Sequence, residues 1–220
     1  MKRSAINAVI AEFKSVLENF RWALPEWAYW SLDDYAANPE VANWLRAHQM
    51  GWDVTDFGQG DFENRGLGLF CVRNGIQSDS STVPYAEKLL LVGEAQETPF
   101  HTHKVKVEDI INRGGGDLMI EFKYRDGIDK KIEIRCDGIL KTPEPGEPVL
   151  FKPGQSVTIP RGLYHRFYGR PGGGTVFVGE VSQVNDDGGD NYFWDPIGRF
   201  SEIDEDEAPL HPLWNEIGTA

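Results

Sequence analysis

Two stretches decide the fold: LMIEFKY at residues 118–124 and KIEIRC at residues 131–136. In both, a large apolar residue or cysteine occupies every second position, and most of the positions between carry Lys, Glu or Arg. Successive side chains of a β-strand point to opposite faces, so this period of two predicts two strands that each bury one face. Asp126-Gly127 lies between them and is typical of a tight hairpin turn. The sequence therefore predicts an antiparallel hairpin here.

Similar strand-like segments occur on both sides of this hairpin. They are Gly68–Arg73, Ala86–Gly93, Val149–Phe151, Ser156–Ile159, Tyr164–Tyr168 and Thr175–Ser182. The 24 glycines and 13 prolines among 220 residues indicate many turns. Seven or eight short strands separated by turns predict a mainly β fold, either a closed antiparallel barrel or two sheets, because such folds cover their strand edges.

Helices are expected before the strands. Apolar residues recur every three or four positions over residues 4–20, which predicts an amphipathic helix with Ser4 as its N-cap. A second helix is expected from Ser31 to Ala47, and Pro39 is placed to break it in two. We expect a single domain of residues 1–220. Its parts are a mostly helical extension (1–65), a β-barrel (66–185) and an acidic C-terminal segment (186–220).

The net charge limits the class of partner. Lys and Arg number 22 against 35 Asp and Glu, giving a formal charge of -13, which repels nucleic acid and anionic membranes. The longest apolar runs are far shorter than the ~20 residues that span a bilayer. The N-terminus turns polar before a signal-peptide core can form, so a cytoplasmic protein is expected. Cys71 and Cys136 lie far apart without a CxxC pattern and are expected to be buried free thiols.

Histidines suggest a metal site. His101 and His103 are two residues apart, so an extended strand projects both to the same side, where they can chelate one ion. Glu108 follows five residues later, and a third histidine, His165, lies in PRGLYH at residues 160–165. An HxH pair alone is a weak signal, because surface and core histidines also occur at this spacing.

The spacing around these histidines resembles the cupin superfamily. Gly93, His101-x-His103, Glu108 and Gly115 are similar to its first motif, and Gly154, Pro160-x-Gly162 and His165 are similar to its second. Two positions depart from the pattern: seven rather than five residues separate Gly93 from His101, and Gly169 stands where Asn is usual. The resemblance implies a cupin-type antiparallel β-barrel, or jelly roll, with the N-terminal helices packed outside.

A narrower resemblance is to the D-lyxose ketol-isomerases, a cupin family of bacterial sugar isomerases. It rests on residues 97–116, ETPFHTHKVKVEDIINRGGG, on the opening MKRSAIN and on WDPIGRF at 194–200. It implies that His101, His103, Glu108 and His165 bind a divalent ion, usually Mn²⁺. It also implies that a monosaccharide is the substrate, with D-lyxose converted to D-xylulose and D-mannose to D-fructose. Three imidazoles and one carboxylate also suit Co²⁺, Fe²⁺, Ni²⁺ or Zn²⁺.

Aldose–ketose isomerisation through an enediol needs a group that moves a proton between neighbouring carbons. Lys106 lies two residues before Glu108, so in a strand it points into the same cavity, where we expect its pKa to be lowered toward the working pH. The alternative is a structural pair with Glu108 or Asp109. Glu180 interrupts an apolar strand and is a second catalytic candidate. Substrate-binding candidates are Lys88, Asp187 and Asp190.

Other functions are compatible with a cupin, because fold alone does not fix chemistry. An iron-dependent dioxygenase would use the same four ligands within a more apolar lining. A phosphosugar isomerase would add an arginine cluster, which Arg161, Arg166 and Arg170 could supply. A non-catalytic sugar-binding cupin would need neither Lys106 nor Glu180. A homodimer is expected, because small cupins commonly pair through their sheets.

Overall fold

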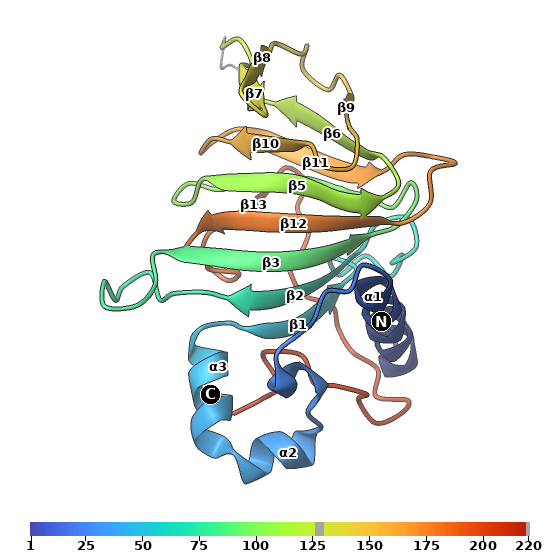
Figure 1. Cartoon of the computed structure of the whole chain (residues 1–220), viewed down its shortest axis with the longest axis vertical. Coiled ribbons are helices and arrows are strands. Elements are labelled where there is room, and N and C mark those ends of the chain that lie inside the picture. The colour runs from blue at the N-terminus through green and yellow to red at the C-terminus, as the bar shows by residue number, and fades with distance from the viewer. Residues whose placement is uncertain (126–129, 219–220) are drawn as a thin grey trace.

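The computed structural model describes residues 1–125 and 130–218, so the turn predicted at Asp126-Gly127 lies outside the described residues. The chain begins with helices, as expected. They are α1 (Arg3–Asn19), the 3-10 helix η1 (Glu26–Tyr29), α2 (Leu32–Ala37) and α3 (Pro39–Ala47). In Figure 1, α2 and α3 lie beyond strand β1, at the edge of a large sheet, and α1 packs against that sheet.

Two antiparallel sheets follow in the described part of the chain. The eight-stranded sheet has the order β1 (Gly51–Thr55), β2 (Leu67–Arg73), β3 (Tyr85–Val92), β12 (Val176–Gln183), β5 (Glu108–Gly115), β10 (Ser156–Ile159), β7 (Ile134–Cys136) and β8 (Ile139–Lys141). The five-stranded sheet has the order β13 (Tyr192–Phe193), β4 (Thr98–Thr102), β11 (Tyr164–Gly169), β6 (Leu118–Lys123) and β9 (Val149–Phe151). The mainly β fold with outer helices is confirmed. The strands form two sheets rather than one hydrogen-bonded closed barrel, an arrangement compatible with a jelly roll. The hairpin predicted from residues 118–124 and 131–136 is wrong, because β6 and β7 lie in different sheets: β6 pairs with β11 and β9, and β7 pairs with β10 and β8.

The main core lies between the two sheets. Leu90 and Val92 of β3 join Ile120 and Phe122 of β6 in one buried cluster. The intervening Leu89 and Leu91 of β3 face the other way, into a second cluster with α1. This explains why β3 is almost continuously apolar: each face of the strand is covered.

Helix α1 covers the outer face of the large sheet through one apolar stripe. Ile6, Ile10, Phe13 and Leu17 recur at three- or four-residue intervals and pack against residues such as Phe177. Burying side chains of this kind stabilises the fold by roughly 1.5 to 3 kcal/mol each. The helix therefore acts as the outer layer of the sheet that carries the cavity described below.

The helix ends show one wrong prediction and two confirmed predictions. Ser4 is not the N-cap of α1, because the helix begins at Arg3 and the carboxylate of Asp206 accepts hydrogen bonds from the Ser4 backbone N–H and hydroxyl. A distant segment thus supplies the acceptor that a local cap normally provides. Ser31 does cap α2, in a reciprocal capping box with Asp34. The break at Pro39 is also confirmed, since Pro39 opens α3.

Two strands lie in segments for which other structure was expected. Strand β1 lies within residues 1–65 and pairs with β2 at the edge of the large sheet. Strand β13 lies within the acidic segment 186–220 and pairs with β4, Phe193 opposite His101. The C-terminal segment therefore extends one sheet at the point where the histidines lie. No described helix is both long and apolar enough to cross a bilayer.

Candidate metal centre

At one end of the space between the two sheets, the inward-facing strand positions are occupied by polar rather than apolar side chains. On β3, Leu90 and Val92 point into the core, and Lys88 occupies the next position of the same parity. On β12, Val176 and Val178 are followed in the same way by Glu180, which pairs in register with Lys88. Alternation along a strand thus places a buried lysine beside a buried glutamate, at an end of the core where a ligand can enter.

The histidines come from the opposite sheet. His101 on β4 lies directly opposite His165 on β11, and a register shift next to this pair sets Phe167 opposite Thr98. The extra residue of this bulge allows both Thr98 and His101 to face the cavity. His103 follows just after β4, and Glu108 begins β5 in the large sheet. The two sheets therefore each contribute to one cluster.

The four expected ligands converge. One ligand atom from each of His101, His103, Glu108 and His165 lies within 4.8 Å of all the others, and all four residues are buried. Glu108 Oε1 lies 2.9 Å from His165 Nε2 and 3.3 Å from His103 Nε2. Yet these three atoms have no hydrogen-bond partner within the described chain. Buried polar atoms are normally satisfied, so three of them aimed at one point fit a bound cation.

The backbone fixes which ring nitrogen is free. The Nδ1 atoms of His101, His103 and His165 lie 2.8, 2.5 and 3.3 Å from the carbonyl oxygens of residues 99, 190 and 163. A carbonyl oxygen can only accept, so each Nδ1 carries the proton and donates it. In the neutral imidazole, Nε2 then keeps its lone pair for a metal ion, which is the usual arrangement of ligating histidines.

The local electrostatics favour the ligating protonation states. Burial lowers the pKa of His101 well below its usual value, and the neighbouring imidazoles lower it further. Burial alone would raise the pKa of Glu108, but His103, Lys106 and His165 outweigh it and hold the pKa well below its usual value. Neutral imidazole and ionised carboxylate are the forms that bind metal. The residues therefore fit a divalent ion of the Mn²⁺ to Zn²⁺ series.

Lys106 lies against the cluster of four candidate metal ligands, although it precedes β5 rather than lying in it. Its Nζ donates to Glu180 Oε1 at 2.7 Å and lies 3.1 Å from Glu108 Oε2. The expected lowering of its pKa is wrong. Burial acts in that direction, but the two carboxylates outweigh it and raise the pKa above the usual value. The structural pair with Glu108 considered above is present, and it lies in the cavity wall.

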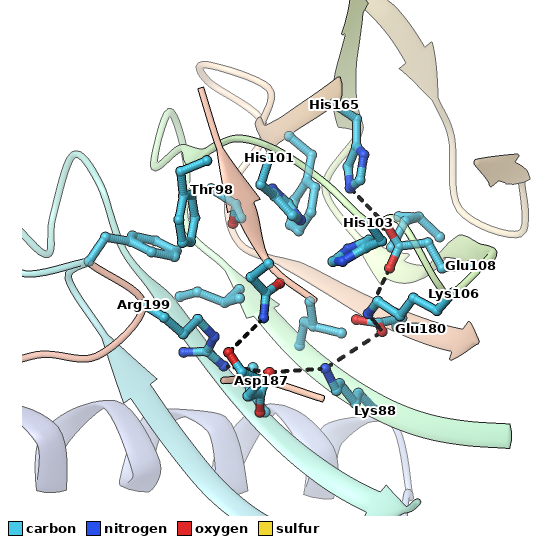
Figure 2. A pocket seen from close by; sticks show the side chains of 18 residues that line it. Lys88, Thr98, His101, His103, Lys106, Glu108, His165, Glu180, Asp187 and Arg199 are labelled. Carbon is cyan, nitrogen blue, oxygen red and sulfur yellow. Dashed lines mark hydrogen bonds and ion pairs between the residues drawn. The ribbon is translucent and has the colours of Figure 1, made fainter. Parts of the chain in front are cut away.

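The C-terminal segment supplies the opposite wall. Asp187 Oδ1 lies 3.7 Å from Lys88 Nζ and 3.3 Å from Arg199 Nη2, and Arg199 in turn donates to Asp53 at 2.6 Å. Burial alone would raise the pKa of Asp187, but Arg199 and Lys88 outweigh it and lower the pKa. Figure 2 shows the histidines and Glu108 at one end of the cavity, Asp187 and Arg199 at the other, and Lys106 and Glu180 between.

Asp190, expected to bind substrate, has a different place. It does not line the cavity formed by the described residues. Its carboxylate accepts hydrogen bonds from the backbone N–H groups of residues 104, 105 and 106, and its own carbonyl oxygen accepts the His103 Nδ1 proton. Asp190 thus ties the C-terminal segment to the loop that carries His103 and Lys106, which makes a positioning role the better proposal.

The cavity and the open solvent at its mouth together hold about 440 Å³ of space not occupied by protein atoms. Its charged or polar lining, apart from the four metal ligands, consists of Lys88, Thr98, Lys106, Glu180, Asp187, Asn191 and Arg199. Asn191, Thr98 and Arg199 were not predicted as site residues, and neither was Asp53 behind the wall. For Arg199 a signal was available, because it lies in WDPIGRF, one of the segments that carry the family resemblance.

The arginines considered for phosphate binding lie elsewhere. Arg166 pairs with Glu121 and Glu97, Arg170 pairs with Asp117, and Arg161 donates to the backbone of residue 105 and to a glutamine. None of the three lines the cavity in the part of the chain that the structure describes. The structure therefore does not bring them together as a phosphate site.

Comparisons with solved structures show the same fold in other proteins. Solved structures with the same fold include the L-ribose isomerases of Acinetobacter sp. DL28 and Cellulomonas parahominis, each in complex with L-ribose. Their TM-scores are 0.62 and 0.61 at 15% and 16% identity, and the match covers 93% of this chain and 98% of each of theirs.

Closer sequence relatives carry a sugar isomerase name. The chain is 42% identical to the D-lyxose/D-mannose isomerase of Escherichia coli O157:H7 over 98% of both chains. It is 40% identical to that of Serratia proteamaculans, over 98% of this chain and 97% of the relative. The sequence model of D-lyxose isomerase matches residues 1–217. The chain therefore belongs to the D-lyxose isomerase family.

Proposed function

We propose that this protein is a metal-dependent aldose–ketose isomerase that interconverts D-lyxose with D-xylulose and D-mannose with D-fructose. The observation that carries the proposal is the position of Lys106 and Glu180, whose 2.7 Å contact lies directly beside the four converging metal ligands. Two relatives with full-length similarity are named D-lyxose/D-mannose isomerase, which supports the choice of sugars.

His101, His103, Glu108 and His165 would hold the ion, for which we propose Mn²⁺. A divalent ion there would supply a Lewis acid that polarises the sugar carbonyl. The fixed Nδ1 contacts hold the imidazoles in place before substrate arrives, so little reorganisation is needed.

Lys106 and Glu180 are proposed to handle protons. In the aldose-to-ketose direction, the C2 proton leaves to a base, an enediol forms, and a proton is added at C1. The Lys106 ammonium offers a donor and the Glu180 carboxylate an acceptor across one hydrogen bond. Burial alone would raise the pKa of Glu180, but Lys106 and Lys88 outweigh it and lower the pKa, so the carboxylate is ionised and able to accept.

The other wall of the cavity is proposed to bind the remaining hydroxyl groups. Lys88 and Arg199 are donors and Asp187 is an acceptor, so the wall offers both partners that a hydroxyl needs. The charges in this wall are already paired with one another, which suits a neutral polyol better than an anion.

The alternatives fit less well. A phosphosugar needs a free arginine cluster in the cavity, and Arg199 is held by Asp53 and Asp187. A dioxygenase would favour an apolar lining, but this one carries Lys88 and Lys106. A purely sugar-binding protein would not need a donor–acceptor pair next to the metal ligands.

The test is to load the protein with Mn²⁺, Co²⁺, Fe²⁺, Ni²⁺ or Zn²⁺ and assay ketose formation from pentoses, hexoses and their phosphates. We expect turnover of D-lyxose and D-mannose, highest with Mn²⁺, and its loss on chelation. Turnover of phosphorylated sugars alone would support the phosphosugar alternative instead. Binding without any turnover would favour the non-catalytic protein.

We further propose a cytoplasmic homodimer. Ile139 and Leu140 on the edge strand β8 are 66% and 50% exposed, and exposed apolar edge strands tend to pair with other chains. Light scattering after size-exclusion chromatography gives the mass directly. A mass near the 24.8 kDa of one chain would contradict the dimer.

A further inference from the structure

A buried asparagine behind the cavity wall joins the two lysines of the site. Asn185 follows β12, is only 3% exposed and lies outside the lining formed by the described residues. Its Oδ1 accepts hydrogen bonds from Lys88 Nζ at 2.7 Å and from Lys106 Nζ at 3.1 Å. An ammonium group only donates, so both contacts require the carboxamide oxygen at this point.

We propose that Asn185 is a positioning residue for catalysis, which holds Lys88 and Lys106 in the cavity wall through one neutral oxygen. The proposal rests on the proposed function, because it assigns Asn185 to the machinery of that isomerase. It names no contact between Asn185 and the sugar.

The two lysines need such a partner. Both ammonium groups approach the same carboxylate oxygen, Glu180 Oε1, at 2.7 Å from Lys106 and 3.6 Å from Lys88. Two like charges beside one acceptor repel each other, and a long lysine side chain has many competing rotamers. A second shared acceptor on Asn185 keeps the two groups together and restricts both side chains.

Asn185 completes a set of three acceptors around the Lys106 ammonium group. Lys106 Nζ lies 2.7 to 3.1 Å from Glu180, Asn185 and Glu108. An ammonium group has three N–H donors, so three acceptors at these distances fix its rotation. Lys88 Nζ donates to Asn185 at 2.7 Å, whereas Glu180 and Asp187 lie at the ion-pair distances of 3.6 and 3.7 Å.

The backbone of Asn185 is itself held in place. The side chain of Asn74, also 3% exposed, accepts a hydrogen bond from the Asn185 backbone N–H and donates to the Asn185 carbonyl oxygen, both at 2.9 Å. The same Asn74 amide donates to the carbonyl oxygen of His48 at 2.9 Å. One carboxamide therefore connects the end of α3, the end of β2 and the segment after β12, and fixes where Asn185 Oδ1 lies.

The test compares Asn185→Leu, which removes the acceptor at similar size, with Asn185→Asp, which keeps an oxygen there. We expect Asn185→Leu to lower kcat for D-mannose by about 10- to 100-fold through Lys106 and to raise KM through Lys88, with metal content unchanged. Asn185→Asp should keep kcat within about fivefold of the parent. Equal losses in the two variants would overturn the proposal.

A double-mutant cycle with Lys106→Met separates positioning from a purely structural role. If Asn185 acts through the lysines, Asn185→Leu should lower the residual turnover of Lys106→Met by less than about threefold. If the fold-losses of the two single variants multiply in the double variant, Asn185 acts independently of Lys106 and the proposal is contradicted. Where Asn185→Leu does not fold, Asn185→Ala takes its place in both experiments.

A third measurement needs no turnover. The protein is labelled with ¹⁵N-lysine, and the NMR signals of Lys88 Nζ and Lys106 Nζ are assigned from the methionine variants. In the parent, the hydrogens bonded to both Nζ atoms should exchange slowly with solvent. Both signals should move or broaden in Asn185→Leu and persist in Asn185→Asp. Unchanged signals in Asn185→Leu would overturn the positioning contact even in an active enzyme. If the Nζ signals change in Asn185→Leu as expected but the parent protein converts no sugar, the positioning contact is supported and the proposed function is contradicted.

Discussion

Replacing Lys106 with methionine tests the proton-transfer role most sharply, because methionine keeps most of the stem volume and removes every N–H donor. The ammonium group contacts two buried carboxylates, Glu108 and Glu180, and one amide, Asn185. Loss of a positioned acid–base group costs ~10²- to 10⁴-fold in rate, which is about 3 to 5 kcal/mol of barrier. We expect turnover of D-mannose to fall by that factor.

The same change should lower stability. Removing one partner of a buried ion pair costs about 3 to 5 kcal/mol, because it leaves a charge uncompensated. Glu180 keeps Lys88 at 3.6 Å, so we expect the lower end, about 3 kcal/mol. For a chain of this length that corresponds to a melting temperature lower by roughly 6 to 12 °C. The protein should still fold at room temperature and bind metal.

The assay follows ketose formation, metal content and thermal unfolding on the same preparations. Lys104→Met is the matched control, because Lys104 is an exposed neighbour in the same loop whose Nζ lies over the ring of Tyr192. We expect the control to retain parental turnover. Turnover of Lys106→Met within a few-fold of the parent would refute the role of Lys106 in proton transfer.

Three further outcomes follow from other parts of the structure. His103→Ala removes one of the converging ligands and should eliminate most bound metal in a folded protein, whereas near-parental metal content by mass spectrometry would contradict the site. Arg3→Met should lower the free energy of unfolding, measured in urea, by about 1 to 3 kcal/mol, because the buried guanidinium pairs with Glu205 and Glu216. The value is moderate because Glu205 is more than half exposed. A loss below about 0.5 kcal/mol would contradict this prediction. Burial raises the pKa of the Cys71 thiol from 9.0 to about 12, so it should resist alkylation at pH 8, and its contribution to stability should be present below pH 9 and lost as the pH rises toward 12. Replacing Cys71 with valine should remove that part of the alkaline loss, and rapid alkylation of the native parent would contradict the assignment.

The strands were predictable wherever a local pattern matched the final packing. The alternation in residues 118–124 corresponds to β6, in which Leu118, Ile120 and Phe122 are buried in the main core. The short strand β1 was missed because its alternation of Trp52 and Val54 with Asp53 and Thr55 covers only five residues. The Ser4 cap was wrong because Asp206, about two hundred positions away, supplies the acceptor.

The cluster of the four candidate metal ligands was predictable because short-range spacing and the family resemblance coincide at these residues. Arg199 and Asp53 were not predictable, because their pairing joins residues 146 positions apart and depends on how the C-terminal segment crosses the cavity. Asp190 shows the converse case. Its position in an acidic cluster suggested a substrate ligand, but three backbone N–H groups surround its carboxylate. Sequence patterns identify the residue types that can act, and tertiary contacts decide which of them face the cavity.

The most direct measurement of the central claim is the deuterium content of sugar recovered from an isomerisation in D₂O. If Lys106 and Glu180 transfer the proton between C2 and C1 through an enediol, the transferred proton can exchange with solvent while it resides on the protein. We predict deuterium at C1 of the D-fructose formed by the Mn²⁺-loaded protein and at C2 of the recovered D-mannose, with both signals lost in Lys106→Met. Full turnover without deuterium at either carbon would contradict the account, because it would indicate hydrogen transfer directly between the two carbons.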